Sequence, residues 1–277
     1  MEILKIISQT ILIQPLTNGL ILFYKLLGEN MGLAIIAFAI FLRLATNPLT
    51  KPYMESMKKL KDFEPQLNKL KEKYKNDKKK LLEAQTEFYK QNGINPGGGC
   101  LPYIFQIIIL IALFTVFNKV LSGGDITSRL NELLYTPLKL TNGHVVVTKF
   151  LYMDITKPEE VFKIPGTSTN LPGPVLILAA IFQFISAKIT QTHVEKDKKK
   201  KGQEDNMQAT MQQSMIYTFP LFTLIFGLKF SSGLAIYWLI FSVIQAIQQY
   251  RTSGWGGLTP FISKLGLAKS PSSKDKK

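Results

Sequence analysis

The sequence has little of what catalysis or metal binding requires. It contains a single cysteine, Cys100, which excludes a disulfide within the chain. The H-E-x-x-H motif of zinc enzymes, the G-x-S-x-G motif of serine hydrolases and a phosphate loop ending in G-K-[ST] are all missing. The two histidines, His144 and His193, lie in expected loops, where we expect them to be solvated. We therefore predict that the chain is not an enzyme and has no catalytic residue, cofactor or metal.

Acidic residues are missing from the apolar parts of the chain. Five mostly apolar segments are each about 20 residues long, the length that a helix needs to cross about 30 Å of hydrocarbon. None of them contains aspartate or glutamate. Proton- and sodium-coupled transporters usually carry an intramembrane carboxylate, and transporters often repeat their spans internally. The sequence shows neither feature, so a small-molecule transporter or channel, the alternative from another functional class, is disfavoured. The five segments are residues 31–49, 99–121, 171–190, 213–230 and 233–250.

Apolar runs alternate with highly charged runs along the chain. The run "YIFQIIILIALFTVF" contrasts with "KKLKDFEPQLNKLKEKYKNDKKK", whereas a soluble core mixes the two classes at the period of a helix or strand. We predict an all-α polytopic membrane protein with five transmembrane helices at the segments given above.

Basic residues gather in three of the connecting segments, and the net charge is +15. Residues 51–91 contain twelve lysines against seven acids, the 191–212 loop contains "EKDKKKK", and the 251–277 tail has six basic residues against one acid. The 122–170 loop is balanced, with five residues of each sign. Cytoplasmic loops carry the excess of lysine and arginine. We therefore predict five crossings, with the N-terminus outside and the C-terminus in the cytoplasm.

The N-terminal segment, residues 1–30, lacks the order of a cleaved signal peptide. Residues 12–28 are interrupted at Pro15 and predict an amphipathic helix that lies on the outer face of the membrane. A sixth crossing, with the N-terminus inside and a tight turn near "GEN", is the alternative. The polar residues of this helix are Asn18, Tyr24 and Lys25.

Residues 50–98 are expected to form a cytoplasmic helical hairpin. Apolar residues recur at three- or four-residue steps from Met54 to Tyr74 on a lysine-rich helix, and "YKNDKKK" separates it from a second helix at residues 81–91. Such a stripe is typical of the packing seam between two helices. Met54 and Met57, near its start, provide an adaptable apolar surface for other segments in the alternative interpretation.

The first apolar segment contains a charge. In "LAIIAFAIFLRLATNPLTKP", Arg43 lies eight residues before Lys51, about 12 Å along a helix. Insertion scales assign an arginine at mid-span about +2.5 to 3.5 kcal/mol. An arginine side chain reaches only about half of that distance, so snorkelling to the interface is disfavoured against a water-filled cavity. Thr46 and Asn47 share the helix face of Arg43.

The other apolar segments carry isolated polar or aromatic residues. Hydrogen bonds between helices are the ordinary explanation for their glutamines. A position at the membrane interface is the ordinary explanation for the aromatic pair Tyr237 and Trp238, although both residues lie a few positions inside the 233–250 segment. These residues are Gln106, Gln183, Tyr237, Trp238 and Gln245.

Four blocks of sequence together identify a resemblance. They are, in order, "FLRLATNPLTKP", "SMKKLKDFEPQLNKLKEKYKND", "NGINPGGGCLPYIFQIIILIALF" and "FPLFTLIFGLKFSSGLAIYWLI". Over residues 16–250 the chain resembles the YidC family of membrane protein insertases, the bacterial relatives of the mitochondrial and chloroplast insertases. The resemblance implies that the protein inserts client membrane proteins into the bacterial cell membrane, alone or beside the Sec translocon, and acts as a chaperone for others.

The resemblance also implies a client-binding groove that is open to the cytoplasm and the lipid and sealed on the outer side. Arg43 stands at the position of an arginine that lines the groove in the family, and Gln183 and Trp238 match further groove positions. The position one turn before the arginine, often threonine in the family, is Ala39 here. The implied groove residues are Arg43, Asn47, Gln106, Gln183 and Trp238, with Met54 and Met57 as client contacts in the hairpin.

The basic segments predict anionic partners. Lysines beside a span bind anionic lipid at about 1 kcal/mol each. For the 251–277 tail, contact with the ribosome through RNA phosphates stays open as a second role. A scaffold that only assembles other membrane proteins stays open as an alternative function. Two alternatives remain for the 122–170 loop: it forms a small β-containing cap, or it is a mobile segment.

Overall fold

The computed structural model describes residues 9–94, 101–121, 124–141, 143–159, 162–163, 170–190 and 207–266, which are mostly helical. They form two compact units. The first unit comprises residues within 1–45, 107–187 and 198–247, and the second comprises residues within 46–106, 188–197 and 248–277.

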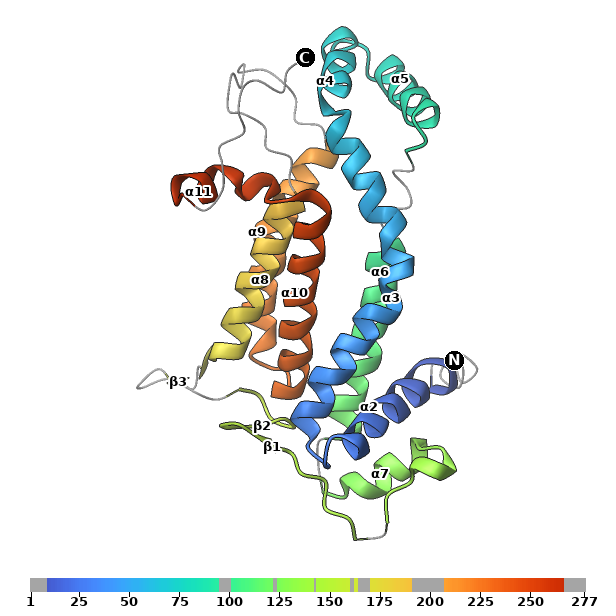
Figure 1. Ribbon diagram of the computed structural model, residues 1–277, viewed down its shortest axis with the longest axis vertical. Coiled ribbons are helices and arrows are strands. Elements are labelled where there is room, and N and C mark those ends of the chain that lie inside the picture. The colour runs from blue at the N-terminus through green and yellow to red at the C-terminus, as the bar shows by residue number, and fades with distance from the viewer. Residues whose placement is uncertain are drawn as a thin grey trace. The chain divides into compact units, whose positions relative to one another are not determined.

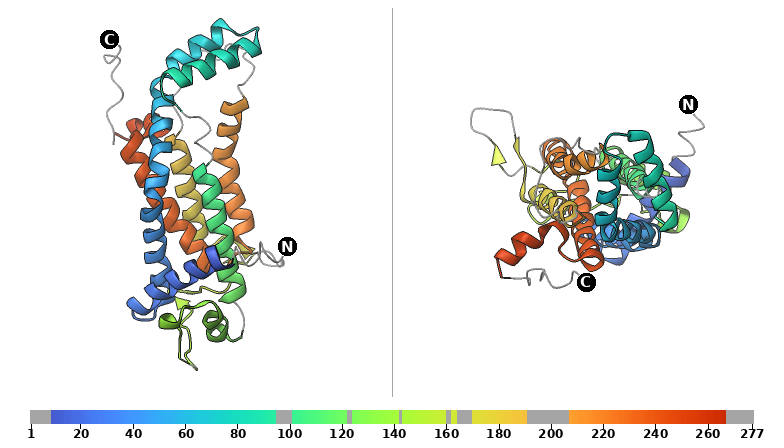
Figure 2. Two further views of the ribbon diagram at one scale, coloured as in Figure 1. Left: turned by 90° about the vertical axis from the view of Figure 1, so that its right-hand side faces the viewer. Right: turned by 90° about the horizontal axis from the view of Figure 1, so that it is seen from above.

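Five helices supply the long elements, and each overlaps one of the apolar segments identified in the sequence. By length and composition, Met31–Pro52 is the one described segment that is long and apolar enough to cross a membrane, and three shorter apolar helices accompany it. In Figures 1 and 2, α8, α9 and α10 lie side by side. The five are α3 (Met31–Asp62), α6 (Leu101–Thr115, continued by the π-helix η3, Val116–Val120), α8 (Pro174–Thr190), α9 (Met207–Gly227) and α10 (Ser232–Ser253).

Helix α3 continues without a break through Pro48 and Pro52. The segment expected at 31–49 and the start of the hairpin expected at 50–98 are therefore one helix. In the first unit its buried residues recur every three or four positions, which defines an inward face. The residues of this face are Met31, Ala34, Ile35, Phe38, Ala39 and Arg43.

The described part of the 122–170 loop is a folded element of the first unit. We call residues 124–141 and 143–159 the cap. It contains α7 (Ile126–Leu133), a short 3-10 helix η4 (Thr136–Leu138) and an antiparallel hairpin of β1 (Lys149–Phe150) and β2 (Met153–Asp154). A second antiparallel pair, β3 (Phe162–Lys163) and β4 (Asn170–Leu171), follows the cap.

Helix α2 (Gln14–Leu26), preceded by the π-helix η1 (Gln9–Ile13), packs against the cap (Figure 1). The buried Asn18 amide uses both of its ends: Nδ2 donates to the Leu133 carbonyl at 2.9 Å, and Oδ1 accepts from the Tyr135 N–H at 2.7 Å. The Tyr24 hydroxyl lies 3.2 Å from His144 Nε2. The expectation that His144 is solvated is therefore wrong, because α2 partly covers its ring; His193 lies outside the described residues.

The end of the cap holds the first turns of two long helices. Glu159 is 6% exposed, and its carboxylate accepts hydrogen bonds from the Val175 and Leu176 N–H groups of α8, at 3.0 and 3.2 Å. Two residues earlier, the Lys157 carbonyl accepts from both N–H and Oγ of Ser232 at the start of α10, at 2.6 and 2.7 Å. These contacts satisfy N–H groups that have no partner within a helix.

The second unit contains a helical hairpin of α4 (Glu64–Lys73) and α5 (Lys78–Gln91), together with η5 (Gly256–Leu258) and α11 (Thr259–Lys264). The helix breaks at Phe63, and Pro65 falls in the first turn of α4, where proline is tolerated. Phe63 packs edge-on against Phe88 of α5, with ring centroids 5.6 Å apart, and Leu67 is buried. These members of the apolar stripe therefore form a packing seam.

Candidate functional site

Arg43 lies inside the first unit. It is 7% exposed, and its guanidinium carbon lies 4.6 Å from the centroid of the Phe241 ring on α10. The face of an aromatic ring attracts a cation, and this attraction is stronger where water is excluded. Phe241 in turn stacks on the buried Tyr237, with centroids 6.2 Å apart. The positive charge is thus held on the inward face of α3 and not on an outward-facing one.

Gln183 on α8 is also buried, at 8% exposure, and it meets a residue that the sequence analysis did not select. Thr223 on α9 is fully buried, and its Oγ1 lies 2.8 Å from Gln183 Oε1 and 3.1 Å from the carbonyl oxygen of Phe219. No described group lies within hydrogen-bonding distance of Gln183 Nε2. Gln183 therefore bridges two helices with one end of its amide and leaves the other end unpaired.

Trp238 on α10 is 5% exposed and packs between two phenylalanines. Its ring stacks on Phe230 with an interplanar angle of 17°, and Phe219 of α9 lies at a steeper 60°, each with centroids 6.1 Å apart. The Ser242 hydroxyl donates to the Trp238 carbonyl one turn later. Trp238 therefore lies in the interior of the first unit, which is unlike a residue of an interface belt.

The remaining expected groove residues belong to the second unit. Asn47, one turn after Arg43 on α3, is exposed, and Gln106 on α6 is partly buried. The side chains of Met54 and Met57 lie outside what the structure describes. Of the groove residues implied by the resemblance, Arg43, Gln183 and Trp238 are thus the ones that are buried in the first unit.

Sequence reasoning missed Thr223 and Phe241. A threonine in an apolar helix commonly bonds to the carbonyl four residues earlier, as Thr223 does with Phe219, so it carries no signal of its own. Phe241 lies three residues after Trp238 on α10, and a pattern of aromatic residues on the face of Trp238 is the signal that could have found it.

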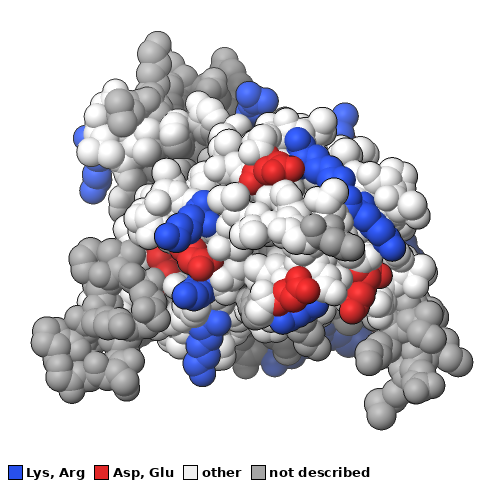
Figure 3. All heavy atoms as spheres, turned by 90° about the horizontal axis from the view of Figure 1, so that it is seen from below, with Lys and Arg blue, Asp and Glu red and all other residues white. Residues whose placement is uncertain are grey.

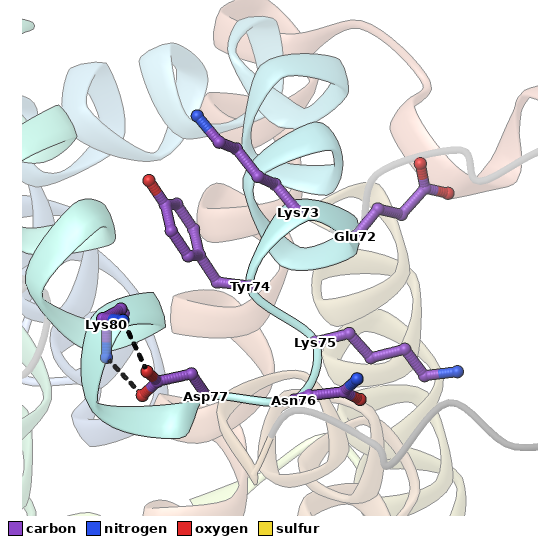
Figure 4. A pocket seen from close by; sticks show the side chains of 7 residues that line it. All are labelled: Glu72, Lys73, Tyr74, Lys75, Asn76, Asp77 and Lys80. Atoms are coloured by element: carbon purple, nitrogen blue, oxygen red, sulfur yellow. Dashed lines mark hydrogen bonds and ion pairs between the residues drawn. The ribbon is translucent and has the colours of Figure 1, made fainter.

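A cavity of about 280 Å³ lies at the turn of the α4–α5 hairpin (Figure 4). Asp77 accepts from the Lys80 N–H at 3.0 Å and caps α5, and the Lys80 ammonium lies 3.4 Å from the same carboxylate. Glu72, Lys73 and Lys75 point in different directions in Figure 4 and do not converge. The turn is therefore a charged surface and not a built binding site.

The cap carries both signs of charge side by side, as the face in Figure 3 shows. Burial and a hydrogen bond to Glu159 raise the pKa of Tyr152 well above its usual value. Burial acts to raise the pKa of Asp154 as well, but hydrogen bonds from Thr156 and Thr148 outweigh it, and that pKa is lowered. Among the described residues, no three His, Cys, Asp or Glu side chains are grouped as a metal site would need.

Comparison with known proteins identifies the family. The family model described as "60Kd inner membrane protein" matches residues 22–255. A protein of Fusobacterium nucleatum named "Membrane protein insertase YidC" is 30% identical over 221 residues, which are 80% of this chain and 85% of that protein. Proteins of the same name from Prosthecochloris aestuarii and Chlorobaculum parvum are 32% and 33% identical, over 91% and 79% of this chain.

The last two relatives are longer proteins, of which the match covers 38% and 32%. The chain thus spans about a third of their length but most of the length of the Fusobacterium protein. The matched region contains Arg43, Gln183 and Trp238, the buried groove residues implied by the resemblance. The resemblance found in the four sequence blocks is confirmed, and the chain belongs to the 60Kd inner membrane protein family, the family of the YidC membrane protein insertases.

Proposed function

We propose that the protein is an insertase and chaperone for membrane proteins, in which the buried Arg43 attracts acidic segments of the client. Membership of the YidC family supports the general activity. The observation that supports the specific role is the burial of Arg43 among apolar helices. A cation held between apolar helices attracts an anion more strongly than one in bulk water, because the surrounding protein and lipid screen it less.

In this proposal Arg43, Gln183 and Trp238 of the first unit line a groove that fills with water and opens to the cytoplasm and the lipid. Asn47 and Gln106 of the second unit are proposed as further client contacts. An acidic tail that enters the groove has a thinner layer of hydrocarbon left to cross. The apolar segment of the client then leaves sideways into lipid, and its burial drives the step at about 25 cal/mol per Å². The membrane potential assists or opposes a charged tail by about 2.3 kcal/mol per charge per 100 mV.

The proposed topology has five crossings, with the cap and α2 on the outer face and the hairpin in the cytoplasm. The mixed charge of the cap, compared with the lysine-rich segments 51–91, 191–212 and 251–277, supports this orientation. The proposed partners are client membrane proteins, with Met54 and Met57 contacting them, anionic lipids at the hairpin, the Sec translocon, and the ribosome at the 251–277 tail.

The test is insertion of a single-span client with an acidic outer tail into liposomes that contain the purified protein, read by protease protection. Arg43→Ala should abolish insertion and Arg43→Lys should retain it, because the role requires a buried positive charge and not the guanidinium shape. Lys51→Ala removes an exposed lysine from the same helix and serves as the matched control.

Equal insertion by wild type, Arg43→Ala and Arg43→Lys, including at low salt, would remove Arg43 as the attracting charge. If wild type inserts no client at all, with acidic or neutral tails, the insertase proposal itself is wrong.

A further inference from the structure

The Thr223 hydroxyl has two oxygen neighbours but only one proton to donate. The Thr223 oxygen lies within hydrogen-bonding distance of two groups, Gln183 Oε1 at 2.8 Å and the Phe219 carbonyl at 3.1 Å. A hydroxyl has one proton to donate. If both neighbours are oxygens, one of the two contacts brings lone pairs together without a proton between them.

Exchanging the amide nitrogen and oxygen of Gln183 removes this conflict. The Thr223 hydroxyl then donates to the Phe219 carbonyl, the usual bond of a threonine in a helix, and accepts from the Gln183 NH₂ group. Oxygen and nitrogen of an amide are distinguished only by such a network. Thr223 thereby fixes the amide so that its carbonyl oxygen occupies the unpaired position.

We propose that this unpaired end of the Gln183 amide binds peptide groups of the client's extended tail, whatever the charge of that tail. The inference rests on the proposed insertase function and adds Thr223 as a positioning residue, since Thr223 acts by orienting Gln183. The chemical class of the ligand is an N–H donor of an extended backbone.

The energetics favour this ligand. A buried polar atom without a partner is unfavourable because it has lost its hydrogen bonds to water, so the closed arrangement around Gln183 is less stable than one in which a donor is present. A helical client segment satisfies its own backbone groups, whereas an extended tail in an apolar environment does not. An extended peptide and the Gln183 amide therefore satisfy each other when the helices part to admit the tail.

The charge of the tail separates this role from that of Arg43. Attraction by Arg43 depends on acidic residues in the tail, and a hydrogen bond to the backbone does not. Loss of the Thr223–Gln183 contact should therefore slow the insertion of clients with acidic and with neutral tails alike. Loss of the Arg43 charge should slow the insertion of clients with acidic tails only.

The experiment measures initial insertion rates of two clients in proteoliposomes, with the same apolar segment and either an acidic or a serine-rich neutral tail. Thr223→Val and Gln183→Met remove the polar groups at nearly constant size. Each should slow both clients about three- to tenfold, the effect of losing one hydrogen bond. Thr223→Ser should restore the rate, and Thr218→Val, at an exposed threonine of the same helix, is the matched control.

The double variant should insert no more slowly than Gln183→Met alone, because Thr223 acts only through Gln183. Unchanged rates in Thr223→Val and Gln183→Met, with wild type active, would overturn the inference and leave the insertase proposal standing. Slowing of the acidic client alone would also overturn it, since the pair would then act through Arg43. If Thr223→Val does not fold, the insertion rates of the two clients with Gln183→Met alone test the inference: equal slowing supports it, and unchanged rates or slowing of the acidic client only overturn it. A wild type that inserts neither client would overturn both proposals.

Discussion

Replacing Glu159 by glutamine should loosen the junction between the cap and α8. The carboxylate receives the Val175 and Leu176 N–H groups and the Tyr152 hydroxyl, and it is nearly fully buried. Gly173 leaves the space for it, because a Cβ at that position would lie 2.1 Å from the Glu159 carboxyl carbon. Glutamine has the same size and fits this space, so the substitution tests the chemistry of the carboxylate and not its packing.

The expected loss of stability can be worked out from the three groups that donate to the Glu159 carboxylate. Glutamine offers one acceptor oxygen, so at least one helix N–H stays buried without a partner, at a cost of about 1–3 kcal/mol. The favourable interaction of a negative charge with a helix N-terminus, worth up to about 2 kcal/mol when partly buried, is lost as well. Relief from burying a charge offsets part of this sum. We expect a net loss of about 2 kcal/mol in the free energy of unfolding.

Thermal unfolding in detergent, followed by circular dichroism, measures this loss. For a chain of this size about 2 kcal/mol lowers the Tm by roughly 4–8 °C. Tyr152→Phe removes one donor and should cost about 1 kcal/mol, whereas Glu132→Gln, at an exposed position of α7, should have no effect. A Glu159→Gln protein that melts within 1 °C of wild type would refute the assignment of Glu159 as the cap of α8.

Three further outcomes follow from contacts in the first unit. Gly32→Ala should lower stability measurably in the same melting assay, because a Cβ would lie 2.0 Å from the Phe150 ring, whereas Gly124→Ala, with open space around it, should not. Asn18→Asp should speed hydrogen exchange in residues 133–135, since a carboxylate repels the Leu133 carbonyl that the amide now contacts; unchanged exchange would contradict this. The lowered pKa of Asp154 contributes stability that is present above its unfolded pKa of about 3.9 and lost as the pH falls through the lower folded pKa. Asp154→Asn should therefore lower stability near neutral pH and weaken its decline below about pH 4, as titrated melting curves would record.

The interior position of Arg43 could be predicted from the sequence because it depends on local geometry. A charge eight residues from the next cation cannot reach the interface from an apolar helix, whichever partners surround it. The inward face of α3 repeats at the helical period, and Arg43 falls on that period. The partner on α10, Phe241, could not be predicted, since its contact joins segments far apart in the chain.

A small β-containing cap was one of the two alternatives for the 122–170 loop, but the contacts of the cap could not be predicted for a related reason. Helix starts are recognised in sequence by a capping side chain next to the first turn. Here the first turn of α8 follows Gly173, and its cap is Glu159, sixteen residues before Val175. Similarly, the Asn18 side chain donates to the backbone carbonyl of Leu133, 115 residues away. A balanced charge and a few turn formers show only that the 122–170 loop is polar, not which helix ends it serves.

The polar groups of the first unit fall into two sets with opposite consequences. At the cap, Glu159 and the Lys157 carbonyl satisfy helix N–H groups that would otherwise lack partners in an apolar environment. Separating α8 or α10 from the cap therefore breaks several hydrogen bonds at once. Around Gln183 an amide end is already unpaired, so parting the helices there costs fewer hydrogen bonds and exposes a group that gains from a ligand. We therefore expect the helices to open near Gln183 while their capped ends stay together, which would keep the outer side sealed as a client enters.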